Sequence, residues 1–513
     1  MDNQKELNKS LKLIVKSSMF VFIGFALAKL LGYLYRIIIA RYFGPEVYGL
    51  FSLTIMILLW FVSFFSLGFF DGILRFIPIY RGKKETKKIR YIIKFSLLTL
   101  FLSSILAGFL LYALSEFISI KILHDPSLVL FLKISSFSIP FYILSYTLLA
   151  IINAYENIKA HTFISDFLFS FIKLIFLVLF IFLGIGINGV IFSYILGIVG
   201  MFFIAYFYSR YKIPEIFGES EIKKLEKKIL RNELFLYSWP LIFLGIISTI
   251  FPYIDSFALA YFKTTYDVGI YNAAVPIAEL MTFVPALFIR LFFPLATREF
   301  YQKNFEVVEE LSKQVQKWIL IAILPFFLMV IIFPGAFLNI IFGPEYISAE
   351  NSLRILVIGF FFSSLITVSY YLIMMVGKTK IIFVDIILGS ILNLILSIIF
   401  VPKYGITGAA IATTISNIIM GLMFFFQANY YTGFIPLRRN MLKITLSSII
   451  PTFLLLYSKH FIPINLINIA IQASFFLLFY LFLIFITKSL DKNDFMILNA
   501  FKRKIKDELH ATQ

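Results

Sequence analysis

Positively charged side chains inside apolar stretches are the residues of this sequence that could do chemistry. Lys29 and Arg36 lie in an apolar run that ends near residue 40, while Arg75 and Arg290 lie toward the ends of two other runs. A charge in membrane hydrocarbon costs roughly 2.5–3.5 kcal/mol on insertion scales, so it normally faces protein or a water-filled space. Arginine and lysine can bind phosphate there, and the planar arginine fork suits it well. We therefore predict that these four residues bind an anionic substrate group.

Each of these cations also has a purely structural interpretation. Lys29 could form a structural ion pair, and Arg36 lies near enough to a helix end to reach the membrane interface. Arg75 follows Asp71 by four residues, which is the spacing of an ion pair within one helix. Arg290 could anchor the inner interface. Because Lys29 and Arg36 are nearly two helical turns apart, they share one helix face, which favours the binding interpretation.

Two acidic residues, Asp255 and Glu279, also lie within apolar runs and have no basic residue four positions away. A buried carboxylate needs either a partner or a proton. The pattern predicts that Asp255 and Glu279 bind a coupling proton or sodium ion. The alternative is that they pair with Lys29 or Arg36 from another helix.

Other kinds of chemistry find no support in the sequence. There is no cysteine, and the four histidines are widely spaced, so neither thiol catalysis nor a metal site is expected. No glycine-rich phosphate loop of the nucleotide-binding type occurs. The sequence therefore predicts a protein that is not an enzyme and has no catalytic residue, metal site or cofactor.

The composition predicts that helices embedded in a membrane position these residues. Of the 513 residues, 60% are hydrophobic and only 14% are charged, against about 45–50% and 25% in soluble domains. Apolar runs of roughly 20 residues recur from end to end, so we predict an all-α polytopic membrane protein with about 14 transmembrane helices. The first of these follows Lys16 without a cleavage signal, which predicts an uncleaved helix.

The net charge of +18 is best explained by loops that orient the chain in the membrane, not by nucleic acid. Basic clusters at 81–90 and 223–231 alternate with loops that carry few cations. Since cytoplasmic loops are enriched in lysine and arginine, both termini are predicted to be cytoplasmic, in the cytoplasmic membrane and in contact with its lipids.

The stretch from Lys29 to Arg75 is predicted to form a transmembrane hairpin. Two apolar runs, at 17–40 and 47–69, flank the short segment Arg41-Tyr42-Phe43-Gly44-Pro45-Glu46. Gly-Pro is a turn signal, and the segment is too short for anything except a tight reversal.

An internal repeat is the second organising feature. Asp166 begins a run that ends in Gly186-Ile187-Asn188-Gly189, and Asp385 begins one that ends in Gly405-Ile406-Thr407-Gly408. Residues 166 and 385 differ by 219, as do 189 and 408. Likewise Gly49-Leu50-Phe51 resembles Gly269-Ile270-Tyr271 at an offset of 220. A constant offset predicts two six-helix lobes with the same orientation, related by an axis along the membrane normal.

The repeat and the longest hydrophilic break together give predicted boundaries. We expect an N-terminal lobe at 1–210, a cytoplasmic linker at 211–234, a C-terminal lobe at 235–430, two further transmembrane helices within 431–487, and a cytoplasmic tail at 488–513. The last two helices lie outside the repeat.

Three segments carry a resemblance to a known family. They are Ala40 to Leu50 (ARYFGPEVYGL), Phe342 to Tyr346 (FGPEY) and Tyr404 to Ala410 (YGITGAA). With the helix number and loop charge, the sequence resembles the polysaccharide transporter, or oligosaccharide flippase, family of the multidrug/oligosaccharidyl-lipid/polysaccharide exporter superfamily. The resemblance implies two lobes in a V around a central cavity. It also implies export of a polyprenyl-linked oligosaccharide by alternating access, without any bond being made or broken.

Two other functions remain open at this stage. A cation-coupled multidrug antiporter of the same fold would want an acidic, aromatic cavity, which Asp255 and Glu279 would suit and Lys29 and Arg36 would not. A membrane enzyme of glycan assembly would want a large extracytoplasmic loop, and the predicted outer loops are all short.

Overall fold

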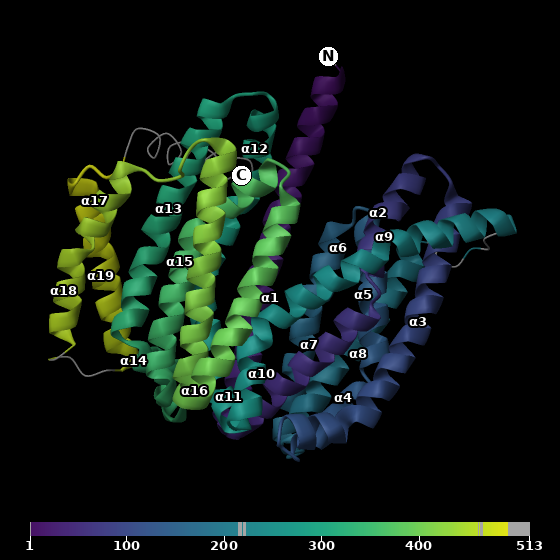
Figure 1. The fold of residues 1–513 in the computed structure, drawn as a ribbon, viewed down its shortest axis with the longest axis horizontal. Helices are drawn as coiled ribbons and strands as arrows, with labels where there is room; N and C mark the ends of the chain where they lie inside the picture. Colours follow the sequence, from purple (N-terminus) through teal and green to yellow (C-terminus); the bar gives the residue numbers. More distant parts are fainter. Residues whose placement is uncertain (1, 214–217, 219–221, 460, 462–464, 491–513) are drawn as a thin grey trace, which may run out of the picture. The chain divides into compact units, whose positions relative to one another are not determined.

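The fold is entirely helical over the part of the chain that the structure describes, as Figure 1 shows. The structure is a computed structural model, and it describes residues 2–213, 218, 222–459, 461 and 465–490. The chain forms two compact units, Met1–Asn272 and Ala273–Gln513. Parts of the predicted linker at 211–234 and most of the predicted tail at 488–513 lie outside the described residues. The predicted domain boundaries therefore stay a prediction.

The first unit is built from ten α-helices, the start of an eleventh, and three short helical segments of other pitch, counted over its described residues. They are α1 (Asp2–Phe65), α2 (Phe69–Gly82), α3 (Thr86–Glu116), η1 (Phe117–Ile122), α4 (Leu128–Ser136), α5 (Ile139–Ala154), α6 (Ile158–Thr162), η2 (Phe163–Leu168), α7 (Phe169–Phe182), α8 (Asn188–Lys212), α9 (Lys224–Ile250), η4 (Phe251–Tyr253), α10 (Ile254–Phe262) and the first residues of α11 (Thr265–Glu279).

The second unit contains the rest of α11 and the C-terminal helices. They are η5 (Leu280–Thr282), α12 (Phe283–Tyr301), α13 (Phe305–Ile332), α14 (Pro334–Ile341), η6 (Pro344–Ala349), α15 (Glu350–Met375), α16 (Thr379–Thr432), α17 (Arg439–Ser447), α18 (Ile449–Ser458) and α19 (Leu466–Ile486).

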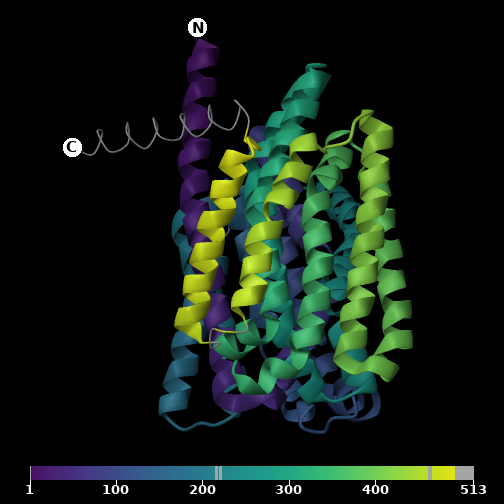
Figure 2. The ribbon, with the colours of Figure 1, turned by 90° about the vertical axis from the view of Figure 1, so that its left-hand side faces the viewer.

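The chain is a multi-pass membrane protein, as predicted, but the count of fourteen spans is not confirmed. Among the described residues eleven helices are long and apolar enough to cross a membrane, or twelve if the bent pair α4 and α5 forms one span. Part of the difference comes from α1 and α16, which each contain two predicted spans. Non-helical backbone at Gly44 and Gly405 breaks these two helices into arms. Figures 1 and 2 show the two arms of α16 side by side.

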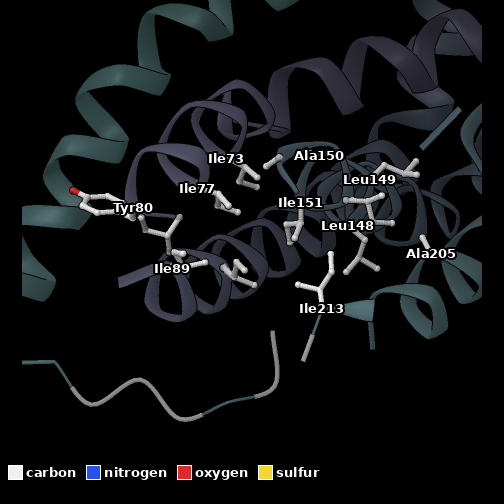
Figure 3. Packing of buried hydrophobic residues seen from close by; sticks show 14 of the residues in the cluster. Ile73, Ile77, Tyr80, Ile89, Leu148, Leu149, Ala150, Ile151, Ala205 and Ile213 are labelled. Carbon is white, nitrogen blue, oxygen red and sulfur yellow. The ribbon is translucent and has the colours of Figure 1, made fainter. Parts of the chain in front are cut away.

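The core of the first unit is aliphatic and lies among α2, α3, α5 and α8 (Figure 3). Ile73 and Ile77 of α2 are fully buried against Ile151 of α5, and Ala205 of α8 lets the helices approach. Burying a side chain of this kind contributes about 1.5–3 kcal/mol in water, but lipid is itself apolar, so close packing must supply the preference here.

The helix α3 has its apolar side outward, as expected for a helix in lipid. Large residues such as Leu98, Leu102 and Phe109 are exposed, whereas the small residues Ser104 and Ala107 are buried. Without a hydrophobic force between helices, membrane proteins place small residues at helix contacts. Large apolar residues outside and small residues inside are therefore the pattern expected of a helix surrounded by lipid.

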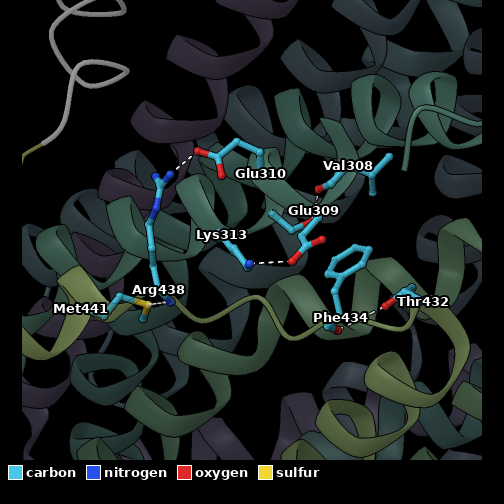
Figure 4. Close-up of polar contacts among 9 residues, drawn as sticks. Val308, Glu309, Glu310, Lys313, Thr432, Phe434, Arg438 and Met441 are labelled. Atoms are coloured by element: carbon cyan, nitrogen blue, oxygen red, sulfur yellow. Dashed lines mark hydrogen bonds and ion pairs between the residues drawn. The ribbon is translucent and has the colours of Figure 1, made fainter. Parts of the chain in front are cut away.

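The second unit uses ion pairs to hold the segment between α16 and α17 against α13 (Figure 4). Arg438, which precedes α17, pairs with Glu310 of α13. Within α13 the ammonium of Lys313 lies 2.6 Å from the carboxylate of Glu309, one turn away. Farther along, Tyr480 of α19 is fully buried in a cluster with Leu324 of α13, so the C-terminal helices pack on α13.

Candidate functional site

The reversal at Gly44 brings two arms of α1 together and places their side chains in contact. Gly44 has φ 82°, a conformation in which glycine meets no steric penalty, and Pro45 starts the second arm. Tyr35 and Phe51, sixteen residues apart, consequently lie with their ring centroids 5.6 Å apart. The predicted hairpin is therefore present, with its turn at the predicted residues.

Lys173 of α7 lies among aromatic rings next to this hairpin. Its Nζ is 4.5 Å from the ring centroid of Phe169, 5.0 Å from that of Tyr35 and 5.7 Å from that of Tyr194. A cation over an aromatic face is attracted by the ring quadrupole, by about 2 kcal/mol where water is excluded. Three rings from α1, α7 and α8 thus hold one ammonium.

The ring of Tyr35 is fixed by hydrogen bonds to α8. Its hydroxyl donates to the carbonyl of Val190 at 3.0 Å and lies 2.9 Å from Oγ of Ser193. The side chain is 1% exposed, so its position is set by packing as well as by these bonds. The ring therefore gives Lys173 a rigid wall.

Arg36 brings a second positive charge to the same region. It follows Tyr35 on α1 and is partly buried, and the ring of Tyr35 lies beside Lys173. Two neighbouring cations gain from a shared anion, because each can then make a charge-assisted hydrogen bond with it. The local chemistry of α1, α7 and α8 therefore favours an anion.

Asp255 of α10 lies in a different environment of the first unit. It is 8% exposed, and its Oδ2 accepts a hydrogen bond from the hydroxyl of Tyr271 on α11 at 2.7 Å. The carboxylate joins the two helices on either side of the corner at Lys263. The Tyr271 hydroxyl is thus a hydrogen-bond partner for Asp255, and a buried polar group is costly without one.

The corner of α1 and the start of α11 touch through two glycines. A Cβ on Gly49 would lie 2.0 Å from the carbonyl oxygen of Thr265, and a Cβ on Gly269 would lie 1.8 Å from that of Pro45. Adding 220 to 45 and 49 gives 265 and 269, so the contact is reciprocal between positions that the predicted repeat makes equivalent. Reciprocity of this kind is the property of a two-fold contact.

Hydrogen bonds also stabilise the crossing, which is the contact of α1 with α11 at Gly49 and Gly269. The hydroxyl of Tyr48 donates to the carbonyl of Asn272 at 3.1 Å, and the hydroxyl of Thr265 bonds to Asp125, which lies just before α4. The backbones can approach this closely only because neither glycine carries a side chain. The crossing therefore joins α1, α11 and the α3–α4 connection.

The remaining predicted residues lie elsewhere. Lys29 is exposed on α1, and Arg75 is exposed on α2, where its guanidinium carbon lies 4.2 Å from the ring centroid of Tyr237 on α9. The alternative pairing of Arg75 with Asp71 is not formed in the described part of the chain. Glu279 and Arg290 are exposed residues of the second unit. The structure thus brings Arg36 close to Lys173 and Asp255 close to Tyr271, and the binding and coupling roles stay predictions.

Sequence reasoning missed the residues that surround the charges. Lys173 was visible as a lysine within an apolar run, but nothing in the sequence chose between an acid and aromatic rings as its surroundings. Tyr194 is twenty-one residues away on the next helix, and Tyr271 is sixteen residues after Asp255. Only the repeat could have drawn attention to Tyr271, as the counterpart of Phe51.

Comparison with known proteins identifies the family. A model of the family described as polysaccharide biosynthesis protein matches residues 14–300, more than half of the chain. A protein of Shigella flexneri named as an O-antigen transporter is 27% identical over 421 residues, which cover 80% of this chain and 96% of that protein.

Two solved structures have a similar fold. A structure of lipid II flippase MurJ in an inward closed conformation superposes with a TM-score of 0.70 at 21% identity, covering 91% of this chain and 98% of that one. An inward-facing multidrug resistance transporter of the MATE family gives 0.64 at 13% identity, covering 80% and 98%. At these identities the likeness shows the fold, and the family model decides the rest: the chain belongs to the polysaccharide biosynthesis protein family.

Proposed function

We propose that this protein is a flippase that exports a polyprenyl-linked oligosaccharide, a precursor of a polysaccharide or cell-surface glycan, across the cytoplasmic membrane. The observation that carries the proposal is membership of the polysaccharide biosynthesis protein family. The named role of the Shigella flexneri relative in O-antigen transport supports it. So does the lipid II flippase among the proteins of the same fold.

The substrate would be recognised mainly by its phosphate groups. A lipid-linked oligosaccharide carries phosphate or diphosphate between sugar and tail, and this group must leave water while the tail stays in lipid. Lys29, Arg36, Arg75 and Arg290 would supply the positive charges that replace its hydration. The position of Arg36, next to the tyrosine whose ring lies beside Lys173, supports this role.

Transport would proceed by alternating access between two six-helix lobes, at 1–210 and 235–430, with the helices within 431–487 outside the repeat. The tight crossing of Gly49 and Gly269 supports a closure point between repeat-equivalent segments. No bond in the substrate would change, so the protein would act as a transporter and not as an enzyme. Both termini would be cytoplasmic.

Asp255 and Glu279 would couple transport to a proton or sodium gradient. The bond from Tyr271 supports a role for Asp255 in a polar site inside the membrane. The amides Asp255→Asn and Glu279→Gln keep the shape and remove the charge. If transport by the double mutant and its response to collapsed proton and sodium gradients match the wild type, the coupling proposal is wrong.

The function is tested by reconstitution. Purified protein in liposomes should move a fluorescent polyprenyl diphosphate oligosaccharide between leaflets, and Arg36→Gln should slow this while leaving protein yield unchanged. Movement of a lipophilic cation in place of the glycolipid would assign the chain to the multidrug antiporters instead. Chemical alteration of the glycolipid would assign it to the enzymes of glycan assembly.

A further inference from the structure

Lys173 of the first unit has aromatic rings, and not an acid, beside its ammonium group. Across the described residues, no carboxylate forms an ion pair with Lys173. The side chain of Lys173 is partly buried and keeps part of its surface exposed. Within the described residues, the charge of Lys173 is thus not neutralised by an ion pair.

A second lysine in the same unit provides the contrast. Lys133 of α4 also has a ring beside it, Tyr112, with Nζ 5.6 Å from the centroid. Yet its ammonium lies 2.6 Å from the carboxylate of Glu116 on α3, so its charge is neutralised within the protein. Both lysines are partly exposed residues on helices of the first unit and have an aromatic neighbour, and they differ in the acid.

The surroundings of Lys173 have a physical consequence. Aromatic faces attract a cation without neutralising it, so they hold the ammonium in place and leave its three hydrogens for an acceptor. Arg36 directly follows Tyr35, whose ring lies beside Lys173, so an anion bound by Lys173 would also be attracted by the charge of Arg36. Tyr35, fixed by its bonds to α8, keeps the ammonium from moving away.

We propose that Lys173 contacts the substrate, as the partner of Arg36 in one site for the diphosphate of the lipid headgroup. The proposal rests on the proposed function, because it takes the transported lipid to be anionic. It adds to that function a contact residue on α7, whose charge the chain itself leaves unneutralised. The rings of Phe169, Tyr35 and Tyr194 act as positioning residues for the ammonium.

The test compares three lysine variants of the full chain in nanodiscs. Lys173→Met removes the charge and keeps the length, Lys173→Arg keeps the charge, and Lys133→Met is the matched control. The probes are undecaprenyl diphosphate, the neutral alcohol undecaprenol, and inorganic pyrophosphate. The wild type should prefer the diphosphate lipid, Lys173→Met should lose about tenfold to a hundredfold of that affinity, and the other two variants should keep it.

The outcomes separate this inference from the function on which it rests. Equal binding of undecaprenyl diphosphate and undecaprenol by the wild type would count against the proposed function. A wild-type preference that survives in Lys173→Met would overturn the inference alone. Pyrophosphate binding as tightly as the diphosphate lipid would assign the site to a free anion, and the lipid headgroup would be wrong.

A measurement on the wild type removes dependence on how the variants fold. An amine-acetylating reagent should modify Lys173 in the empty protein, and mass spectrometry should show that undecaprenyl diphosphate protects it while undecaprenol does not. Acetylation of Lys133 should be the same with either lipid. Equal modification of Lys173 with both lipids would overturn the inference.

Discussion

Two helix corners of the first unit have charged residues of opposite sign beside them. At the first corner Tyr35 packs on Phe51, with Arg36 and Lys173 close by. At the second, Asp255 takes the position of Tyr35 and Tyr271 that of Phe51, since adding 220 to 35 and 51 gives 255 and 271. One pair packs ring against ring, and the other is a hydrogen bond of 2.7 Å.

The difference shows what the predicted repeat would preserve and what it would not. Both predicted copies have a glycine where the backbones touch, whereas farther along the helices one has a ring contact and the other a carboxylate. In the predicted repeat, equivalent positions can therefore carry different chemistry. In the proposed function, Arg36 would bind substrate and Asp255 the coupling ion.

The largest effect is expected where the two corners touch. Gly49→Val should abolish transport and lower the yield of folded protein, because its Cβ would lie 2.0 Å from the carbonyl oxygen of Thr265. Gly269→Val should do the same, because the contact is reciprocal. Liposome transport and thermal unfolding of the purified variants measure both effects.

The control for this prediction lies on the same helix. A Cβ on Gly32 would meet no atom within 4 Å, so Gly32→Ala should be neutral or stabilise by about 0.5–1 kcal/mol. If Gly32→Ala and Gly49→Val lower the stability equally, the prediction that the contact at Gly49 requires a glycine is wrong.

A smaller effect is expected from the acid corner. Tyr271→Phe removes the hydrogen bond to the carboxylate of Asp255 and should cost about 1–3 kcal/mol in the free energy of unfolding, because a buried acceptor loses this donor. Steric trapping in bicelles measures this quantity. A loss that persists when Asp255→Leu, which has no acceptor, is already present would show that the tyrosine acts on something other than the carboxylate.

The equivalent change at the cationic corner should cost less. Tyr35→Phe keeps the ring beside Lys173 and removes neutral hydrogen bonds to Val190 and Ser193, for which about 0.5–1.5 kcal/mol is expected. The same unfolding measurement applies. A cost above that of Tyr271→Phe would reverse the ranking of the two corners.

The smallest effect is expected away from both corners. The ion pair of Lys133 with Glu116 has exposed partners, with 31% and 65% of their side-chain surface accessible. Exposed ion pairs are screened and contribute little, so Lys133→Met should leave stability almost unchanged. A double-mutant cycle with Glu116→Gln isolates the pair, and a coupling as large as the effect of Tyr35→Phe would contradict the prediction.

The helical fold, the hairpin and the positions of its turns could be predicted because each depends on local properties. A transmembrane helix is indicated by its own apolar run, and the reversal is indicated by the adjacent residues Gly44 and Pro45. The number of spans differs in part because α1 and α16 each continue across a glycine break, at Gly44 and Gly405, so each is one helix that contains two predicted spans. The packing of α2 against α5 and α8 also depends on which small residues meet, which one sequence does not reveal.

The charges of the site could be predicted, and their surroundings could not. Burial in lipid makes Arg36 and Asp255 conspicuous in any sequence, because charged residues are rare there. The bond from Tyr271 and the rings around Lys173 are contacts between helices, and their formation depends on helix rotation. The rotation of each helix about its axis is fixed by packing over the whole unit, so it cannot be predicted from a local stretch of sequence.

The reciprocal contact of Gly49 and Gly269 also bears on the origin of the chain. Pro45 meets Gly269 in the way that Thr265 meets Gly49, which is how two identical subunits meet across a two-fold axis. A gene duplication that fused the halves of such a homodimer would leave this crossing inside a single polypeptide. Fusion then frees each half to change alone, which a symmetric dimer cannot do. In the predicted repeat, Arg36 of one half is matched by Ser256 of the other, a difference that two identical subunits could not have.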